Sequence, residues 1–188
     1  MEKIQKLSCT LKKIFQILAI ASPILICLQW LLIDWQPVKT LVQMSMILKP
    51  VITPEGLVNF AEITMSSTSK LVALFGNLLG ATPYILGYIL LHKLFSNYQH
   101  GQIFNKSNPA IFQKLGRLIL INGILIIPLQ EGLMVVAATL NSPPGHRYLT
   151  LSFGKPNLEA ILCGLLVIVI SWVMQEGQAL QEENQLTV

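Results

Sequence analysis

The chain contains very little charge and only three cysteines. Only 12% of its 188 residues are Asp, Glu, Lys or Arg, while 53% are hydrophobic. A water-soluble domain usually carries about twice that share of charged residues. The three cysteines, Cys9, Cys27 and Cys163, lie far apart and have no Cys or His partner at the spacing typical of zinc sites. These shortages disfavour a soluble enzyme, a disulfide framework and a metal centre, and no cofactor is predicted.

Long apolar runs take up most of the sequence instead. Four of them cover about residues 14–33, 71–91, 118–138 and 158–173. A helix needs about 20 mostly apolar residues to cross a bilayer, so each run predicts one membrane span. We expect an all-α polytopic membrane protein with a single four-helix transmembrane domain over residues 1–188. Its outer loops should hold a short amphipathic helix and at most one short strand.

The distribution of basic residues predicts the orientation of these spans. Lys and Arg are retained on the cytoplasmic side of short loops. If both termini face the cytoplasm, eight Lys and Arg lie inside and five lie outside. The first run continues past the signal-like residues 19–21, so we interpret it as an uncleaved membrane helix. The net charge of +4 follows from this bias and requires no direct contact with nucleic acid.

The first and third loops have local patterns of their own. Residues 53–55, Thr-Pro-Glu, are typical of a helix start, and one apolar face would then comprise Leu57, Phe60, Ala61 and Thr64. Residues 148–153 alternate apolar and hydroxyl side chains, which predicts a strand that needs a pairing partner.

Single residues predict where helices begin, bend and end. Asn108 and Asn157 should cap the third and fourth helices, Pro83 should kink the second, and Gly177 should end the fourth. Small residues one turn apart let helices approach closely in lipid. We expect them to serve packing within the chain, with a dimer face as the alternative, at Gly76, Gly80, Gly87, Ala160 and Gly164.

Glu131 is the only acid well inside an apolar run. A charge at mid-bilayer costs about 2.5–3.5 kcal/mol on insertion scales, so an intramembrane acid is a functional candidate. Gln130, Asn122 and Asn77 complete the set of intramembrane polar candidates. Two hypotheses stay open: ion, proton or ligand handling, and a structural hydrogen bond to Asn77, to Tyr84 or to a backbone group freed by a proline.

The C-terminal tail, residues 174–188, is acidic and polar and ends in an apolar tripeptide. We expect it to be cytoplasmic. It is either a solvated tail, packed on the basic second loop, or a docking peptide for a cytoplasmic partner.

Two patches resemble a known family. The second loop has Leu-Phe at 94–95, Gly-x-Ile-Phe at 101–104 and Asn108, and the tail has Glu-Gly-x-x-Leu-x-Glu-Glu-Asn-x-Leu-Thr-Val at 176–188. The chain thereby resembles the uncharacterised bacterial membrane proteins grouped as domain of unknown function 2975 (DUF2975). The resemblance implies a four-helix inner-membrane protein without established activity, often encoded beside a small helix-turn-helix regulator.

The resemblance also implies which residues would bind a partner. These candidates are Glu176, Leu180, Glu182, Glu183, Asn184, Leu186, Thr187, Val188, Phe95, Gly101 and Phe104. We therefore expect a membrane-bound regulatory or sensory protein that binds a cytoplasmic DNA-binding regulator.

Two alternatives stay open, and one class is disfavoured. The first alternative is a small transporter or channel subunit that uses Glu131, for which a homo-oligomer is required. The second is a membrane protein that confers immunity to a toxin. An enzyme is not expected, because the apolar runs contain no Ser–His or paired-Asp constellation and no HExxH motif.

Overall fold

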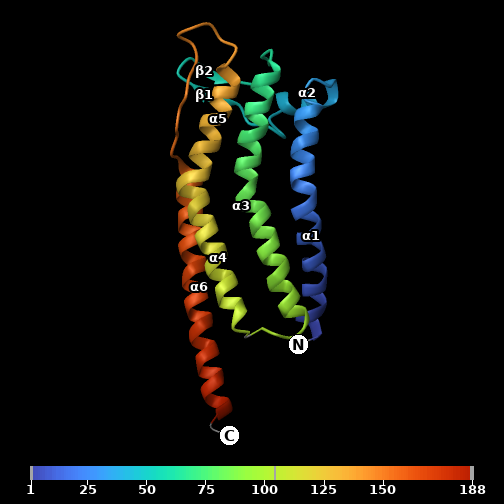
Figure 1. The fold of residues 1–188 in the computed structure, drawn as a ribbon, viewed down its shortest axis with the longest axis vertical. Coiled ribbons are helices and arrows are strands. Elements are labelled where there is room, and N and C mark those ends of the chain that lie inside the picture. The colour runs from blue at the N-terminus through green and yellow to red at the C-terminus, as the bar shows by residue number, and fades with distance from the viewer. Residues whose placement is uncertain (1, 104, 187–188) are drawn as a thin grey trace. The chain divides into compact units, whose positions relative to one another are not determined.

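The computed structural model describes residues 2–103 and 105–186, and these residues are mostly helical (Figure 1). In chain order the elements are α1 (Glu2–Leu31), α2 (Gln36–Gln43), β1 (Val51–Thr53), β2 (Gly56–Val58), α3 (Ser67–Gln99), α4 (Ser107–Ile121), the π-helical turn η1 (Asn122–Ile126), α5 (Ile127–Thr139) and α6 (Lys155–Leu186).

Within the described residues, four helical stretches are long and apolar enough to cross a membrane. They are Lys3–Leu31, Ser67–Gln99, Ser107–Thr139 and Lys155–Leu180. The third comprises α4, η1 and α5 without a break. The predicted all-α fold with four membrane helices is thereby confirmed, and the chain is a multi-pass membrane protein. Each helix begins before its predicted apolar run, and the first ends two residues earlier than expected.

The chain packs as two compact units, which are described separately. Unit 1 comprises Met1–Ala21, Pro83–Ile124 and Lys155–Val188, and unit 2 comprises Ser22–Thr82 and Leu125–Gly154. The helix α3 passes from unit 2 into unit 1 at Pro83 without interruption, although a proline removes one backbone hydrogen bond.

Glycines bring α4 and α6 of unit 1 into backbone contact. A Cβ added at Gly164 would lie 3.0 Å from the carbonyl oxygen of Gly116, and one added at Gly116 would lie 2.9 Å from that of Gly164. The predicted packing residue Ala160 also belongs to this seam, because its Cβ lies 2.9 Å from the position of a Cβ at Gly123. The small residues of α6 therefore pack within the chain.

The middle of the third membrane helix departs from α geometry. The turn η1 precedes Pro128, which lacks the N–H that a regular helix would use at that point. Asn157 at the start of α6 donates its side-chain amide to the Gly123 carbonyl at 2.9 Å. Asn157 is thus the third residue of α6, and its amide supports the π-turn of the neighbouring helix.

In unit 1, aromatic rings join α1 to α3. Phe15 stacks on Tyr88 and on Phe95, with ring centroids 6.1 and 5.6 Å apart. One turn before Phe15, the Lys12 carbonyl lies 3.1 Å from His92 Nδ1, and Lys12 Nζ lies 3.5 Å from the side-chain oxygen of Gln99. The start of α1 is thereby attached to the end of α3.

The core of unit 2 gathers around Trp30, whose ring meets Phe60 edge to face. The strands β1 and β2 form an antiparallel hairpin, with Thr53 opposite Gly56. The helix predicted to start at residues 53–55 is therefore wrong: Pro54 and Glu55 form the turn of the hairpin. Pro and Gly are favoured at the second and fourth positions of a type I turn, which Thr-Pro-Glu-Gly satisfies. The amphipathic helix of this loop is α2 instead.

The strand predicted at residues 148–153 is also wrong. This segment is extended but unpaired in any sheet, and it lies against α5 at Gly132. A Cβ at Gly132 would lie 3.1 Å from the Thr150 carbonyl oxygen and 3.0 Å from Leu151 Cδ2. The alternation of side chains therefore reflects packing of an extended segment on a helix. Gly177, predicted to end α6, lies inside it.

Adding a methyl group at Gly164 should weaken the contact between α4 and α6. Gly164→Ala forces either Leu120 or the Gly116 backbone to move, and such overpacking costs about 1–3 kcal/mol. Gly177→Ala on the same helix is the control, because no described atom lies within 4 Å of its Cβ position. Thermal unfolding in detergent should show a lower midpoint for Gly164→Ala only. Equal shifts would refute the close backbone contact.

Candidate functional site

The intramembrane acid Glu131 has a partner that lies outside the membrane helices. The hydroxyl of Ser152, in the extended segment 148–153, donates to the Glu131 carboxylate. The structure thus gives Glu131 a hydrogen bond to a loop residue and not to Asn77 or Tyr84. Ser152 was missed because nothing in the sequence relates it to Glu131.

Gln130 lies over a glycine of the neighbouring helix. Its side-chain amide donates to Asn77 Oδ1 at 3.5 Å, and a Cβ at Gly80 would overlap Gln130 Oε1. Gly76 approaches the same helix, because its Cβ position lies 3.1 Å from Leu133 Cβ. The predicted packing residues Gly76 and Gly80 therefore face α5, and their small size makes room for the polar contact.

Asn122 stands apart from these polar residues. It is the first residue of η1 and is buried, and its side-chain oxygen has no hydrogen-bond partner among the described residues. Gly87, the remaining packing candidate, lies in ordinary contact distance of Leu115 and Leu118. Among the intramembrane polar candidates, the described hydrogen bonds join Gln130 to Asn77.

The second loop begins with a sharp, glycine-dependent helix end. Gly101 has φ +75°, a conformation that favours glycine. Its N–H donates to the Tyr98 carbonyl, and the Gln102 N–H donates to the Asn97 carbonyl. These two bonds form a Schellman motif, with Gly101 as the first residue past the cap. The predicted candidate Gly101 therefore shapes the chain where α3 ends.

Asn108 holds the other end of this loop. It is fully buried, accepts from the Asn97 amide at 2.7 Å, and donates to the carbonyls of Gln102 and Ile103 at 2.8 and 2.7 Å. It was predicted as a helix cap, but α4 begins one residue earlier, and Asn108 instead clasps the loop. We call Asn97, Gly101 and Asn108 the loop clasp.

The remaining predicted partner-binding residues differ in exposure. Phe95 is packed between Phe15 and Tyr98. Glu176, Leu180 and Glu183 are exposed on α6. Glu182, Asn184 and Leu186 belong to the last turns of that helix, whereas Phe104, Thr187 and Val188 lie outside the described residues.

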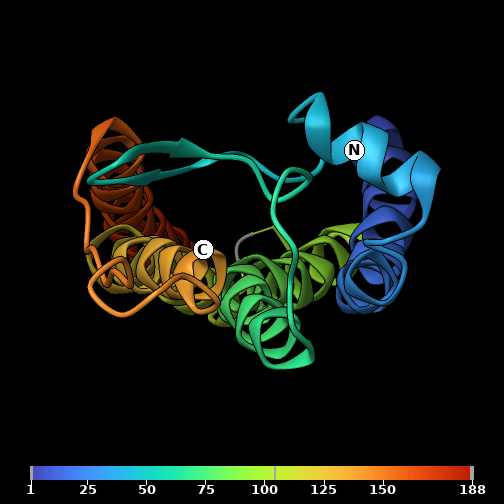
Figure 2. The ribbon, with the colours of Figure 1, turned by 90° about the horizontal axis from the view of Figure 1, so that it is seen from above.

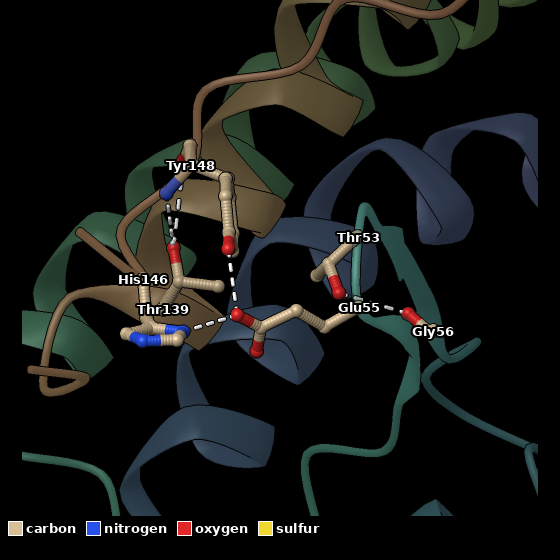
Figure 3. Close-up of polar contacts among 6 residues, drawn as sticks. All are labelled: Thr53, Glu55, Gly56, Thr139, His146 and Tyr148. Carbon is tan, nitrogen blue, oxygen red and sulfur yellow. Dashed lines mark hydrogen bonds and ion pairs between the residues drawn. The ribbon is translucent and has the colours of Figure 1, made fainter.

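A polar cluster joins the β-hairpin to the third loop (Figure 3). One carboxylate oxygen of Glu55, at the hairpin turn, accepts from His146 Nδ1 and from the Tyr148 hydroxyl, the latter at 2.6 Å. Thr139 at the end of α5 accepts from the Tyr148 N–H at 3.1 Å. Glu55 and its two donors are solvent-exposed, whereas Thr139 is buried. Sequence reasoning missed the cluster because Glu55 is more than 90 residues from His146 and Tyr148.

These contacts shift the protonation of the cluster. The hydrogen bonds from Tyr148 and then His146 lower the pKa of Glu55, and the bond to Glu55 raises the pKa of Tyr148. Both donors stabilise a charged carboxylate, which is typical of a structural anchor. Among the residues that the structure describes, no three His, Cys, Asp or Glu side chains are grouped to hold a metal.

Replacing Asn108 should loosen the second loop. Asn108→Ala removes the side-chain partner of the Gln102 and Ile103 carbonyls and one of the two partners of the Asn97 amide. A buried group left unsatisfied costs about 1–3 kcal/mol, and these part-buried groups should cost less. Gln113→Ala on the same helix is the control, because its side chain bonds to no described residue. Hydrogen exchange of residues 99–107 should accelerate for Asn108→Ala alone. Unchanged exchange in that variant would contradict the clasp.

Acid should release the hairpin from the third loop. The pKa of Glu55 is lowered in the folded protein. Its hydrogen bonds therefore stabilise the contact between the hairpin and the third loop at neutral pH, and this stabilisation is lost as the pH falls through the lowered pKa. Glu55→Gln should show the released state at neutral pH, measured as faster proteolysis within residues 140–154. Glu62→Gln, in the same loop but without a side-chain bond to any described residue, should behave as wild type. Acid-insensitive proteolysis of the wild type would contradict this role.

Comparison with known proteins adds one assignment. No curated protein and no solved structure matches the chain. The family model described as a protein of unknown function (DUF2975) matches residues 17–188, which include the loop clasp, the Glu131 region and the tail. Because this match covers most of the sequence, the chain belongs to the DUF2975 family.

Proposed function

We propose that this is an inner-membrane regulatory protein with both termini in the cytoplasm, which binds a small helix-turn-helix regulator there. In this proposal it acts by binding and not by catalysis. The observation that carries it is the continuation of α6 beyond its apolar run. The run ends at Met174, yet the helix continues to Leu186.

The extension presents one ordered face. Glu176, Leu180 and Glu183 are exposed and follow one another at spacings of four and three residues. Residues so spaced lie on the same side of a helix. An apolar side chain between two acids suits a partner with a basic, partly apolar surface, and DNA-binding proteins have basic surfaces because they contact phosphates.

The location of the extension supports the same proposal. Within unit 1, the end of α6 lies at the same end of the helices as the start of α1 and the second loop (Figure 1). The N-terminal tail and this loop carry eight of the Lys and Arg residues. The positive-inside rule therefore favours the cytoplasm for this end. The loop clasp would give a partner a loop of fixed shape next to the acidic helix.

Reversing the charge of the extension should release the regulator. Glu176→Lys/Glu183→Lys places two cations on the face that would bind a basic partner. Less of a co-expressed helix-turn-helix regulator should then co-purify, and its operator occupancy should change in cells. Glu159→Lys, near the other end of α6, is the control and should leave both readouts unchanged. The variants are compared at equal amounts in the membrane.

A photocrosslinker can locate the contact directly. Leu180 and Leu162 are 54% and 53% exposed on the same helix, but only Leu180 belongs to the extension. The proposal expects a crosslink to the regulator from position 180 and none from 162. Undiminished co-purification after charge reversal, together with no crosslink from position 180, would refute it.

A further inference from the structure

The short helix α2 has apolar side chains that its own unit does not cover. It begins at Gln36, five residues after α1 ends at Leu31, and it runs across the direction of α1 (Figures 1 and 2). Val42 is fully buried in the core of unit 2, with Val38 packed beside it. Beside this buried stripe, Leu41 and Met44 are exposed, and another side of the helix is polar, with Gln36, Lys39 and Gln43.

The end of α2 adds another apolar side chain to this group. The Ser45 N–H donates to the Val42 carbonyl at 2.9 Å, and the Met46 N–H donates to the Leu41 carbonyl at 3.0 Å. This is a Schellman motif, and its usual hydrophobic contact joins the positions that Leu41 and Met46 occupy here. Ser45 has φ +56°, where glycine is favoured. The chain thus adopts an unfavourable backbone angle to place Met46 on the side of Leu41.

We infer that Leu41, Met44 and Met46 enter the lipid of the leaflet at which α1 ends, so that α2 is an interfacial helix lying on the membrane surface. The inference does not depend on the proposed regulatory function. An amphipathic helix of this kind buries its apolar side at the boundary between headgroups and acyl chains. The polar side, with Lys39 and Gln43, would face water.

Continuity with the membrane-spanning surface identifies lipid as the occupant. The last turn of α1 and the residue after it expose Leu31 and Leu32, and Trp35 is 60% exposed at the start of α2. Because an extended chain covers at most about 3.6 Å per residue, the five residues from Leu31 to Gln36 keep the start of α2 within about 18 Å of the end of α1. Trp is enriched at that depth of a bilayer.

The size of the apolar group disfavours a protein partner. A stable protein interface buries about 800 Å² on each side and involves about 20–30 residues. Leu41, Met44 and Met46, with Leu31, Leu32 and Trp35 beside them in the chain, are far fewer than that, and polar residues lie on another side of the helix. Lipid contact has no such minimum, because its strength scales with the apolar area that is buried.

Spin labels at single cysteines test the inference in the full chain. A cysteine-free background is made by replacing Cys9, Cys27 and Cys163 with Ser. Met44→Cys and Met46→Cys are then compared with Lys39→Cys and Gln43→Cys on the polar side, in nanodiscs of phosphatidylcholine and phosphatidylglycerol. Collisions of each label with oxygen, which dissolves in lipid, are measured against collisions with a water-soluble nickel chelate.

We expect the ratio of oxygen to nickel collisions to be several-fold higher at positions 44 and 46 than at 39 and 43. Brominated lipids should also quench the fluorescence of a dye attached at position 44 but not at 43. Equal ratios at all four positions would overturn the inference, because α2 would then lie in water. Low collision rates with both reagents at 44 and 46 would overturn it too, because protein would cover them.

Discussion

Backbone groups that water cannot reach must find hydrogen bonds within the chain, and the rest of this structure follows from that requirement. Inside a bilayer only helices meet it locally, which is why four long helices account for most of the described residues. Where a helix departs from regular geometry, a side chain supplies the missing donor. The Asn157 amide does so for the Gly123 carbonyl at the π-turn, and the Asn108 amide does so for two carbonyls of the second loop.

Glycines determine how closely these helices approach one another. The contact of Gly116 with Gly164 lets two backbones touch, whereas Gly80 makes room for the side chain of Gln130. Lipid provides no hydrophobic drive for helix association, so close packing and polar contacts must hold the helices together. The same pattern of small residues thus allows backbone packing at Gly164 and a polar side-chain contact at Gly80. Which of the two occurs depends on the residues of the neighbouring helix.

The sequence was most informative where one physical effect dominates. Apolar runs of about 20 residues have few alternatives to membrane helices, so the four spans were predictable. The hairpin turn at Thr53-Pro54-Glu55 was not predictable from proline alone, because proline is favoured both in the first turn of a helix and in a tight turn. Gly56, at the fourth position of the turn, was the distinguishing signal. The partners of Glu131 and Glu55 come from distant loops, and no local pattern in a single sequence relates Glu131 to Ser152 or Glu55 to His146.

The residues of the two family-like patches, in the second loop and in the tail, have different structural roles. In the second loop, Gly101 and Asn108 are needed for the shape of the chain, and Phe95 is packed against α1. A folding requirement is therefore enough to explain them. In the tail, Glu176 and Leu180 are exposed on a helix that already has its backbone bonds. Local folding gives no reason for these particular side chains, so the tail is where a binding partner is the stronger explanation.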